Sequence, residues 1–146
     1  MTIAEILRRK GTGVVSVRPQ DGAVAVARTL AEHRIGAALV CDETGAVLGI
    51  VSERDIVRAL AAEGGEALLA MDAARLMTRV LHTVTPRTSV VEALGMMTDR
   101  RVRHLPVLAD DGSLAGIVSI GDLVKHRIVE VEHEAEELRS YVAQAG

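Results

Sequence analysis

The amino-acid sequence repeats itself. Residues 49–58 read GIVSERDIVR, and residues 116–125 read GIVSIGDLVK. The offset of 67 residues between Asp55 and Asp122 (122 − 55) is kept without a gap back to Val17. A unit of this size lies near the lower limit for burying a core of its own, so we expect two copies that share one core.

The composition restricts that core to aliphatic side chains. Of the 146 residues, 49% are apolar, but only 1% are aromatic, and Tyr141 is the single Phe, Trp or Tyr residue. Many proteins that bind single-stranded nucleic acid stack bases on aromatic side chains, which this chain lacks. The formal net charge of −3 provides no general basic field, so nucleic-acid binding is not expected.

The remaining composition indicates an ordinary cytoplasmic protein. The single cysteine, Cys41, excludes an intramolecular disulfide framework, and we expect it to have a structural role. The five histidines show no metal-binding spacing, so no metal is expected, and we expect His126 and His133 to face solvent. No apolar run approaches the roughly 18 residues of a membrane span, and the first residues resemble a helix start and not a signal peptide.

Hydrophobic periodicity and turn residues divide the first copy into strands and helices. Thr2 and Glu5 form a capping-box pattern, which predicts a helix up to about Lys10. The pattern then predicts a strand, a helix, a two-stranded hairpin and a second helix, over residues 14–17, 23–33, 37–41, 47–51 and 53–62. Each copy is therefore expected to be strand, helix, strand, strand, helix, in an α/β (α+β) fold.

The second copy repeats this order. Its elements are predicted over residues 80–84, 89–100, 104–108 and 114–118, with a last helix from residue 120 on. Residues 63–66 read as a short flexible linker, which places the domain boundary between 1–66 and 67–146. Residues 67–77 are expected to form a helix that enters the second copy as the N-terminal helix enters the first.

The two ends of the chain carry apolar helical faces. An amphipathic C-terminal helix with one buried seam is predicted by the spacing of Ile128, Val131, Ala135, Leu138 and Val142. One small pair of domains can bury this seam and the face of Ile3, Ile6 and Leu7 only in part, so a homodimer is expected. Alternatively, either helix closes the core of the monomer.

The motif Ser-x-x-Asp occurs at matched positions where a strand turns into a helix. In Ser52–Asp55 and Ser119–Asp122, the serine and the acid together can cap the helix. In both copies Gly-Ile-Val precedes the motif, and the glycine would let a ligand or another backbone come close. Helix capping alone and ligand binding are thus both open.

A nucleotide would suit such a turn. A carboxylate at the helix start can accept hydrogen bonds from both hydroxyls of a ribose, while helix N–H groups and the serine hydroxyl face a phosphate. An adenine can lie between aliphatic side chains and bond its polar edge to strand backbone, such as that of Ser16, Val17, Ala37 and Ala38.

Together these features resemble a tandem pair of CBS domains (cystathionine-β-synthase domains). The resemblance rests on the duplicated units, on Gly-Ile-Val-Ser-x-x-Asp and on His104-Leu105-Pro106-Val107; the segments 52–57, 101–107 and 119–125 resemble small stand-alone bacterial CBS-pair proteins. It covers nearly the whole chain. It implies a pseudo-twofold pair with two sites in a cleft for AMP, ADP, ATP, S-adenosylmethionine or NAD(H), and dimers that form flat discs.

The resemblance also implies which residues contact ligand. The first site would use Ser16, Val17, Ala37, Ala38, Ser52, Arg54 and Asp55. The second site would use Thr83, Val84, Arg101, Arg103, His104, Leu105, Pro106, Ser119 and Asp122.

The two predicted sites differ in charge. Arg54 could reach a phosphate, whereas its counterpart Gly121 leaves space. The second copy instead has a basic cluster around Arg101 and Arg103, which could bind phosphate or could simply be a solvated helix end. We therefore expect two non-equivalent sites, one of which accepts a larger ligand such as a dinucleotide.

The expected function is a non-catalytic regulatory module that senses adenine nucleotides or NAD(H), and so energy or redox state, and signals to an unknown protein partner. The chain carries no Ser/His/Asp order, Walker loop or paired general acid and base, so no enzyme is expected. Two alternatives remain: a structural or interaction protein in which both motifs are only caps, and a binder of S-adenosylmethionine.

Overall fold

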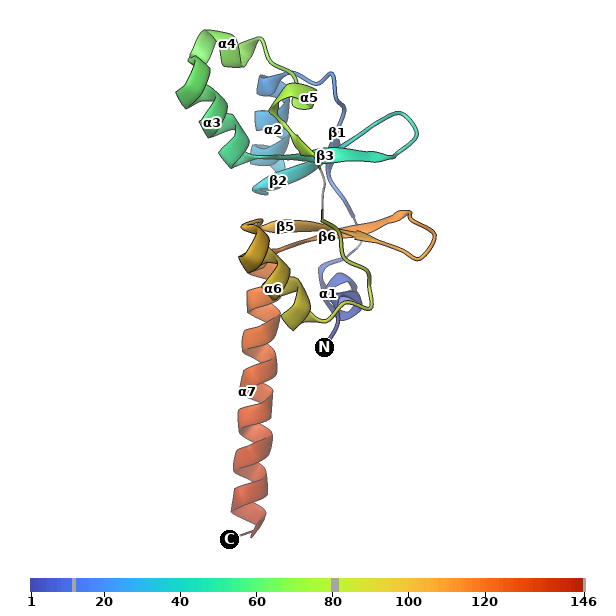
Figure 1. The fold of residues 1–146 in the computed structure, drawn as a ribbon. Helices are drawn as coiled ribbons and strands as arrows, with labels where there is room; N and C mark the ends of the chain where they lie inside the picture. Colours follow the sequence, from blue (N-terminus) through green and yellow to red (C-terminus); the bar gives the residue numbers. More distant parts are fainter. Residues whose placement is uncertain (12, 80–81, 146) are drawn as a thin grey trace. The chain divides into compact units, whose positions relative to one another are not determined.

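The computed structural model describes residues 1–11, 13–79 and 82–145, which form two compact units (Figure 1). The first-copy unit comprises Gly13–Thr83 and Asp111–Leu114. The second-copy unit comprises Met1–Thr12, Val84–Asp110 and Ala115–Gly146. The N-terminal segment therefore belongs to the unit that holds the second copy.

The first-copy unit is a mixed sheet with helices packed against it. Its elements are β1 (Ser16–Val17), α2 (Ala23–His33), β2 (Ala37–Cys41), β3 (Val47–Ser52), α3 (Glu53–Glu63), α4 (Gly65–Leu69), α5 (Ala73–Leu76) and β4 (Thr78–Arg79). The strand order is β1-β2-β3-β4. Strand β1 runs parallel to β2, and the other neighbours are antiparallel. The predicted order strand, helix, strand, strand, helix is confirmed in this copy.

The second-copy unit has the same plan. Its elements are α1 (Ile3–Lys10), α6 (Val90–Arg100), β5 (His104–Leu108), β6 (Leu114–Ser119) and α7 (Ile120–Ala145). Strands β5 and β6 pair, and Val84 adds a single parallel bridge to Val107. The strand predicted over 80–84 is otherwise not formed at His82 and Thr83, while Val80 and Leu81 lie outside the described residues.

The helix that precedes each copy packs on the other copy. In α1, Ile3 N–H donates to Thr88 O at 2.9 Å, which ties the helix to the second copy. In α5, Ala73 N–H donates to Asp21 O at 2.7 Å, which ties that helix to the first copy. The order of packing therefore differs from the order along the chain. Hydrophobic periodicity could not predict this difference, because it shows where a helix forms but not which sheet the helix covers.

The segment 67–77 departs from its predicted structure for a local reason. Instead of one helix entering the second copy, it holds the end of α4 and then α5, both in the first-copy unit. Asp72 adopts extended backbone and accepts the N–H of Arg75 as an N-cap, which starts α5 afresh.

Each unit has a cluster of buried apolar residues of its own. The first-copy cluster is built mainly from residues of β1, α2, β2, β3, α4 and α5; it comprises Val17, Ala23, Val26, Leu30, Ala38, Val40, Val51, Leu68, Met71, Ala73 and Leu76. The second-copy cluster comprises Ile3, Ile6, Leu7, Val84, Val90, Ala93, Met97, Leu105, Val107, Val118 and Leu123. Helix α1 thus supplies core side chains to its own unit. Of the two roles considered for this helix, a dimer contact or closure of the monomer core, this is the second.

Two predictions for the C-terminal helix are wrong. Its apolar seam is exposed, with 53% of the Ile128 surface and 63% of the Leu138 surface accessible to solvent. Its buried residues are Leu123 and His126, so His126 does not face solvent as expected, whereas His133 does. Among the described residues, no helix is both long and apolar enough to cross a membrane.

Candidate functional site

The first Ser-x-x-Asp motif is a reciprocal helix cap. Ser52 ends β3 and adopts extended backbone, from which its hydroxyl accepts the N–H of Asp55 at 3.3 Å. Oδ2 of Asp55 in turn accepts the N–H of Ser52 at 2.8 Å and its hydroxyl at 3.0 Å. The cap satisfies N–H groups at the helix start, so it holds the carboxylate in a defined position.

The second motif has the same geometry. Ser119 ends β6, and its hydroxyl accepts the N–H of Asp122 at 3.1 Å. Oδ2 of Asp122 accepts the N–H of Ser119 at 2.9 Å. The capping interpretation of both motifs is therefore confirmed, and in both copies the cap uses Oδ2 of the acid.

The two acids differ in their other neighbours. Oδ1 of Asp55 accepts a long hydrogen bond of 3.3 Å from the hydroxyl of Thr78. Oδ2 of Asp122 accepts a hydrogen bond from the Lys10 ammonium at 2.7 Å, and this ammonium also donates to Ile117 O at 3.0 Å. The first-copy acid thus lies beside a neutral hydroxyl and the second-copy acid beside a cation.

Neither Thr78 nor Lys10 was found from the sequence. Each belongs to the segment that precedes one copy along the chain and packs on the other copy. The sequence shows that Lys10 is a basic residue at the end of a predicted helix. Its partner, however, depends on which unit α1 joins.

The surroundings of Asp122 favour its ionised form. Partial burial raises the pKa of this carboxyl, but hydrogen bonds from Lys10 and Ser119, together with the charge of Lys10, outweigh burial. The net result is a pKa below the usual value. Asp122 is therefore an anion at neutral pH and can accept hydrogen bonds from hydroxyl groups.

Strand backbone lies next to the first cap. Ser16 and Val17 of β1 pair with Leu39 and Val40 of β2, and Ala37 of β2 pairs with Ser52. The predicted residues Ser16, Val17, Ala37, Ala38, Ser52 and Asp55 therefore lie on adjoining parts of one sheet and its following helix. Ala37 and Ala38 are buried, as is Val17, while Ser16 is exposed.

The corresponding backbone of the second copy follows the same arrangement. Val84 N–H donates to Pro106 O at 3.0 Å, which places Val84 beside β5. Ile120 N–H donates to Arg103 O at 2.8 Å, which joins the start of β5 to the second cap. Leu105 and Pro106 are buried and His104 is half-buried, whereas Thr83 is exposed at the end of the first-copy unit.

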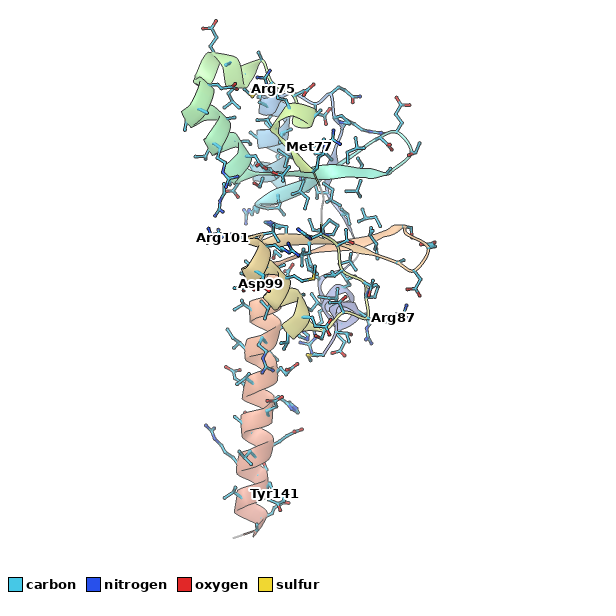
Figure 2. The ribbon with its side chains drawn as sticks, viewed as in Figure 1. Arg75, Met77, Arg87, Asp99, Arg101 and Tyr141 are labelled. Carbon is cyan, nitrogen blue, oxygen red and sulfur yellow. The ribbon has the colours of Figure 1, made fainter. Side chains whose placement is uncertain are left out.

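The predicted basic residues are exposed. Arg54 lies in the first turn of α3, and Arg103 precedes β5. Arg101 is the C-cap of α6 with φ 55°, and Arg34 of α2 has the same role with φ 53° (Figure 2 labels Arg101). Arg101 thus lies at a helix end, with its side chain exposed.

The repeated glycines lie against other segments of the chain. A Cβ on Gly49 would lie 2.6 Å from Thr78 O and 2.8 Å from Sδ of Met77. A Cβ on Gly116 would lie 2.8 Å from Cδ2 of Leu7. Of the two roles open from the sequence, these glycines serve close approach of the segments that carry Thr78 and Lys10.

Two other features are not among the predicted contacts. A hollow between α2 and α3 is lined by Ala27, Leu30, Ala31, Arg34, Ile35, Gly36, Glu53, Ile56 and Val57, and none of the predicted site residues lines it.

Burial, and then Asp42, raise the pKa of the Cys41 thiol, and Arg18 and Ser16 lower it less. The raised pKa disfavours the reactive thiolate, in agreement with a structural role.

Comparison with known proteins defines the class. The CBS domain model matches residues 3–62 and 73–128. The chain therefore belongs to the CBS-domain family, as a tandem pair. The resemblance inferred from the repeat is confirmed, and so is the fold class.

Relatives share both sequence and fold. A mitochondrial CBS domain-containing protein of Arabidopsis thaliana is 33% identical over 97% of this chain and 71% of its own length. A CBS-domain protein of Agrobacterium tumefaciens is 41% identical, with a TM-score of 0.83 over 87% of this chain and 99% of its own. A CBS domain protein of Pyrobaculum aerophilum, solved in complex with AMP, is 30% identical, with a TM-score of 0.76 over 90% of this chain and 97% of its own.

Proposed function

We propose that the protein is a non-catalytic regulatory module that binds adenosine-containing ligands through Asp55 and Asp122. The observation that carries the proposal is the geometry of the two acids. Each is held by a cap through Oδ2, so that Oδ1 lies outside the cap and can accept a hydrogen bond from a ribose hydroxyl. In Asp55 this bond would be added to the long one from Thr78, since a carboxylate oxygen can accept two hydrogen bonds. The AMP complex of the Pyrobaculum relative supports this ligand class.

The other contacts follow the predicted division into two sites. Adenine would bond to strand backbone beside the caps, at Ser16, Val17, Ala37 and Ala38 in the first copy. In the second copy the corresponding contacts are Thr83, Val84, His104, Leu105 and Pro106. Arg54 in the first site, and Arg101 and Arg103 in the second, would meet phosphate groups.

The two sites are proposed to differ in ligand preference. Lys10 partly neutralises Asp122 and adds a cation to the second copy, whereas Thr78 adds no charge beside Asp55. The second site should therefore favour ligands with more negative charge, such as ADP, ATP or NAD(H), over S-adenosylmethionine, whose sulfonium is positive. No metal is needed for this binding.

Binding would act by linkage. A ligand that binds one arrangement of the protein 100-fold better than another shifts the equilibrium by about 2.7 kcal/mol. We propose that the protein works in the cytoplasm as a homodimer, reads energy or redox state, and changes its affinity for a protein partner.

Calorimetry on nucleotide-stripped protein tests the proposal. AMP, ADP, ATP, NAD, NADH and S-adenosylmethionine would be titrated separately, and at least one should bind with saturable heat. If the folded protein binds none of them, the alternative remains, in which both motifs are only helix caps of an interaction protein. Hydrolysis of a nucleotide above the solution background would instead indicate an enzyme.

A further inference from the structure

Helix α7 continues well beyond the part that packs on its own unit. It comprises 26 residues, of which Leu123 and His126 are buried, and Arg127 and Glu130 are half-buried. From Val131 to Ala145 every side chain is exposed except the half-buried Ala135. Figure 1 shows this part of α7 extending past α1 and α6 of the same unit, and Figure 2 labels Tyr141 near its end.

Most of the exposed large apolar side chains of α7 follow a heptad pattern, whereas Ile120, Val129 and Tyr141 lie beside it. We call the following residues the α7 seam: Val124, Ile128, Val131, Ala135, Leu138 and Val142. Their spacings are four, three, four, three and four, so they occupy alternating d and a positions of a heptad. An average period of 3.5 residues is that of helices that pair in a left-handed coiled coil.

The seam is unpaired in a single chain. The exposed part of α7 after Glu130 spans 15 residues, or about 22 Å of helix. A helix of this length is marginal in water by itself, so a packing partner would stabilise it strongly. Its N-terminal part is already held against the folded unit, which lowers the entropic cost of pairing the rest.

The charges beside the seam identify the partner as a second copy. The charged g positions are Arg127 and Glu134, and the e positions that face them in a parallel pair are Glu132 and Arg139. Arg127 also has an ion pair with Glu130 of its own helix. Parallel, in-register pairing therefore sets Arg127 opposite Glu132 and Glu134 opposite Arg139 on both sides of the seam.

Antiparallel pairing of the whole seam is disfavoured. With Val131 opposite Ala135, it would bring Glu132 close to Glu132 of the second copy and Glu134 close to Glu134 of the second copy. It would also bring Lys125 close to Arg139. Like charges at these positions destabilise a coiled coil, whereas opposite charges select partner and orientation.

We propose that α7 pairs with α7 of a second copy as a parallel, in-register, two-stranded coiled coil along the α7 seam. The proposal specifies the homodimer proposed above, and it does not depend on nucleotide binding. The outer face, which carries His133 and its ion pair with Glu137, stays in water. The small Ala135 lies at the middle of the paired segment, where it lets the two helices approach closely.

Cysteine cross-linking tests the arrangement. In a Cys41→Ala background, Val142→Cys places a thiol on the seam, and Ser140→Cys places one on the outer face. Parallel in-register pairing brings the two seam thiols together, so Val142→Cys should form a disulfide dimer under mild oxidation, and Ser140→Cys should remain monomeric on a non-reducing gel. Equal cross-linking of both variants, or of neither, would overturn the proposal.

Analytical ultracentrifugation distinguishes the α7 coiled coil from a dimer formed by another surface. Leu138→Glu should weaken the dimer at least tenfold, whereas the matched outer-face variant Ser140→Glu should not. A cooperative urea unfolding transition of both variants would show that the two units remain folded. A dimer that Leu138→Glu leaves intact would retain the homodimer but refute the coiled coil. A wild-type chain that stays monomeric at high micromolar concentration would refute both.

A charge exchange tests the orientation. Glu134→Arg alone and Arg139→Glu alone each set like charges opposite each other in the parallel pair and should weaken the dimer severalfold. The double variant restores opposite charges and should recover the wild-type dissociation constant. Failure of the double variant to recover would show that the helices do not pair in this register.

Discussion

The ammonium of Lys10 lies 2.7 Å from Oδ2 of Asp122, although 112 positions separate the two residues in the chain. This ion pair joins the end of α1 to the start of α7 within the second-copy unit. It is partly shielded, with 35% of the Lys10 side chain and 26% of the Asp122 side chain exposed. The pair thus connects the packing of α1 to the acid proposed to bind ribose.

Lys10→Met should destabilise the second-copy unit. The substitution keeps the aliphatic stem but leaves a half-buried carboxylate without its cation, at a cost of about 1 kcal/mol. Urea unfolding monitored by circular dichroism measures the change. Arg79→Met, on an exposed residue at the end of β4, is the control and should change the free energy of unfolding by less than about 0.5 kcal/mol. Equal effects of the two variants would mean that the ion pair contributes nothing.

The same pair predicts a pH dependence. Because the pKa of Asp122 is lowered in the folded state from its ordinary 3.8, its contribution to stability is present above that value. The contribution is lost as the pH falls through the lower, folded-state pKa. Wild type should therefore lose its stability advantage over Lys10→Met as the pH falls below about 3.8, and urea titrations from pH 6 to 3 would measure this. A constant difference across that range would contradict the prediction.

Asp55→Asn and Asp122→Asn should each abolish binding at one site. An asparagine keeps an oxygen for the cap, so the cost in stability should be about 1 kcal/mol, but it lacks the charge that strengthens a bond from a ribose hydroxyl. Calorimetry with the best ligand should show the loss of one class of sites in each variant and of both in the double variant. Full affinity in both single variants would support the cap-only alternative.

Alanine at the two repeated glycines should have unequal effects. In Gly49→Ala the new methyl group meets the backbone oxygen of Thr78, which cannot move without disturbing β4, so a loss of about 2 kcal/mol or more is expected. In Gly116→Ala it meets the flexible end of Leu7, and the loss should stay near 1 kcal/mol or below. Chemical unfolding of both variants would measure the difference. A smaller loss at Gly49 than at Gly116 would contradict this account.

His126→Phe should stabilise the protein. Nε2 of His126 is buried and has no hydrogen-bond partner among the described residues. A phenyl ring keeps the flat shape and removes the unsatisfied nitrogen, which should add about 1 kcal/mol to the free energy of unfolding. Thermal unfolding is the measurement. The exposed His133, changed to Phe as a control, should bring no such gain, and a lower melting temperature for His126→Phe would indicate an unrecognised partner of the ring.

Local patterns in the sequence were enough to predict most of the elements. The repeat predicted two copies with the same order of strands and helices, because turn residues and apolar periodicity act over a few neighbouring positions. The same local chemistry predicted both caps, since Ser52 with Asp55 and Ser119 with Asp122 satisfy the first N–H groups of their own helices.

Tertiary packing decided which segments meet. The sequence placed α1 before the first copy, yet Ile3, Ile6 and Leu7 lie in the core of the second copy and bring Lys10 to Asp122. Similarly, the apolar spacing in α7 showed a seam but not its surroundings, and the structure leaves Ile128 and Leu138 exposed while it buries His126. Periodicity specifies that a helix has an apolar face. Which surface covers that face depends on the chain connections and on all the other apolar faces that compete for the same surface. Only the folded chain decides this competition.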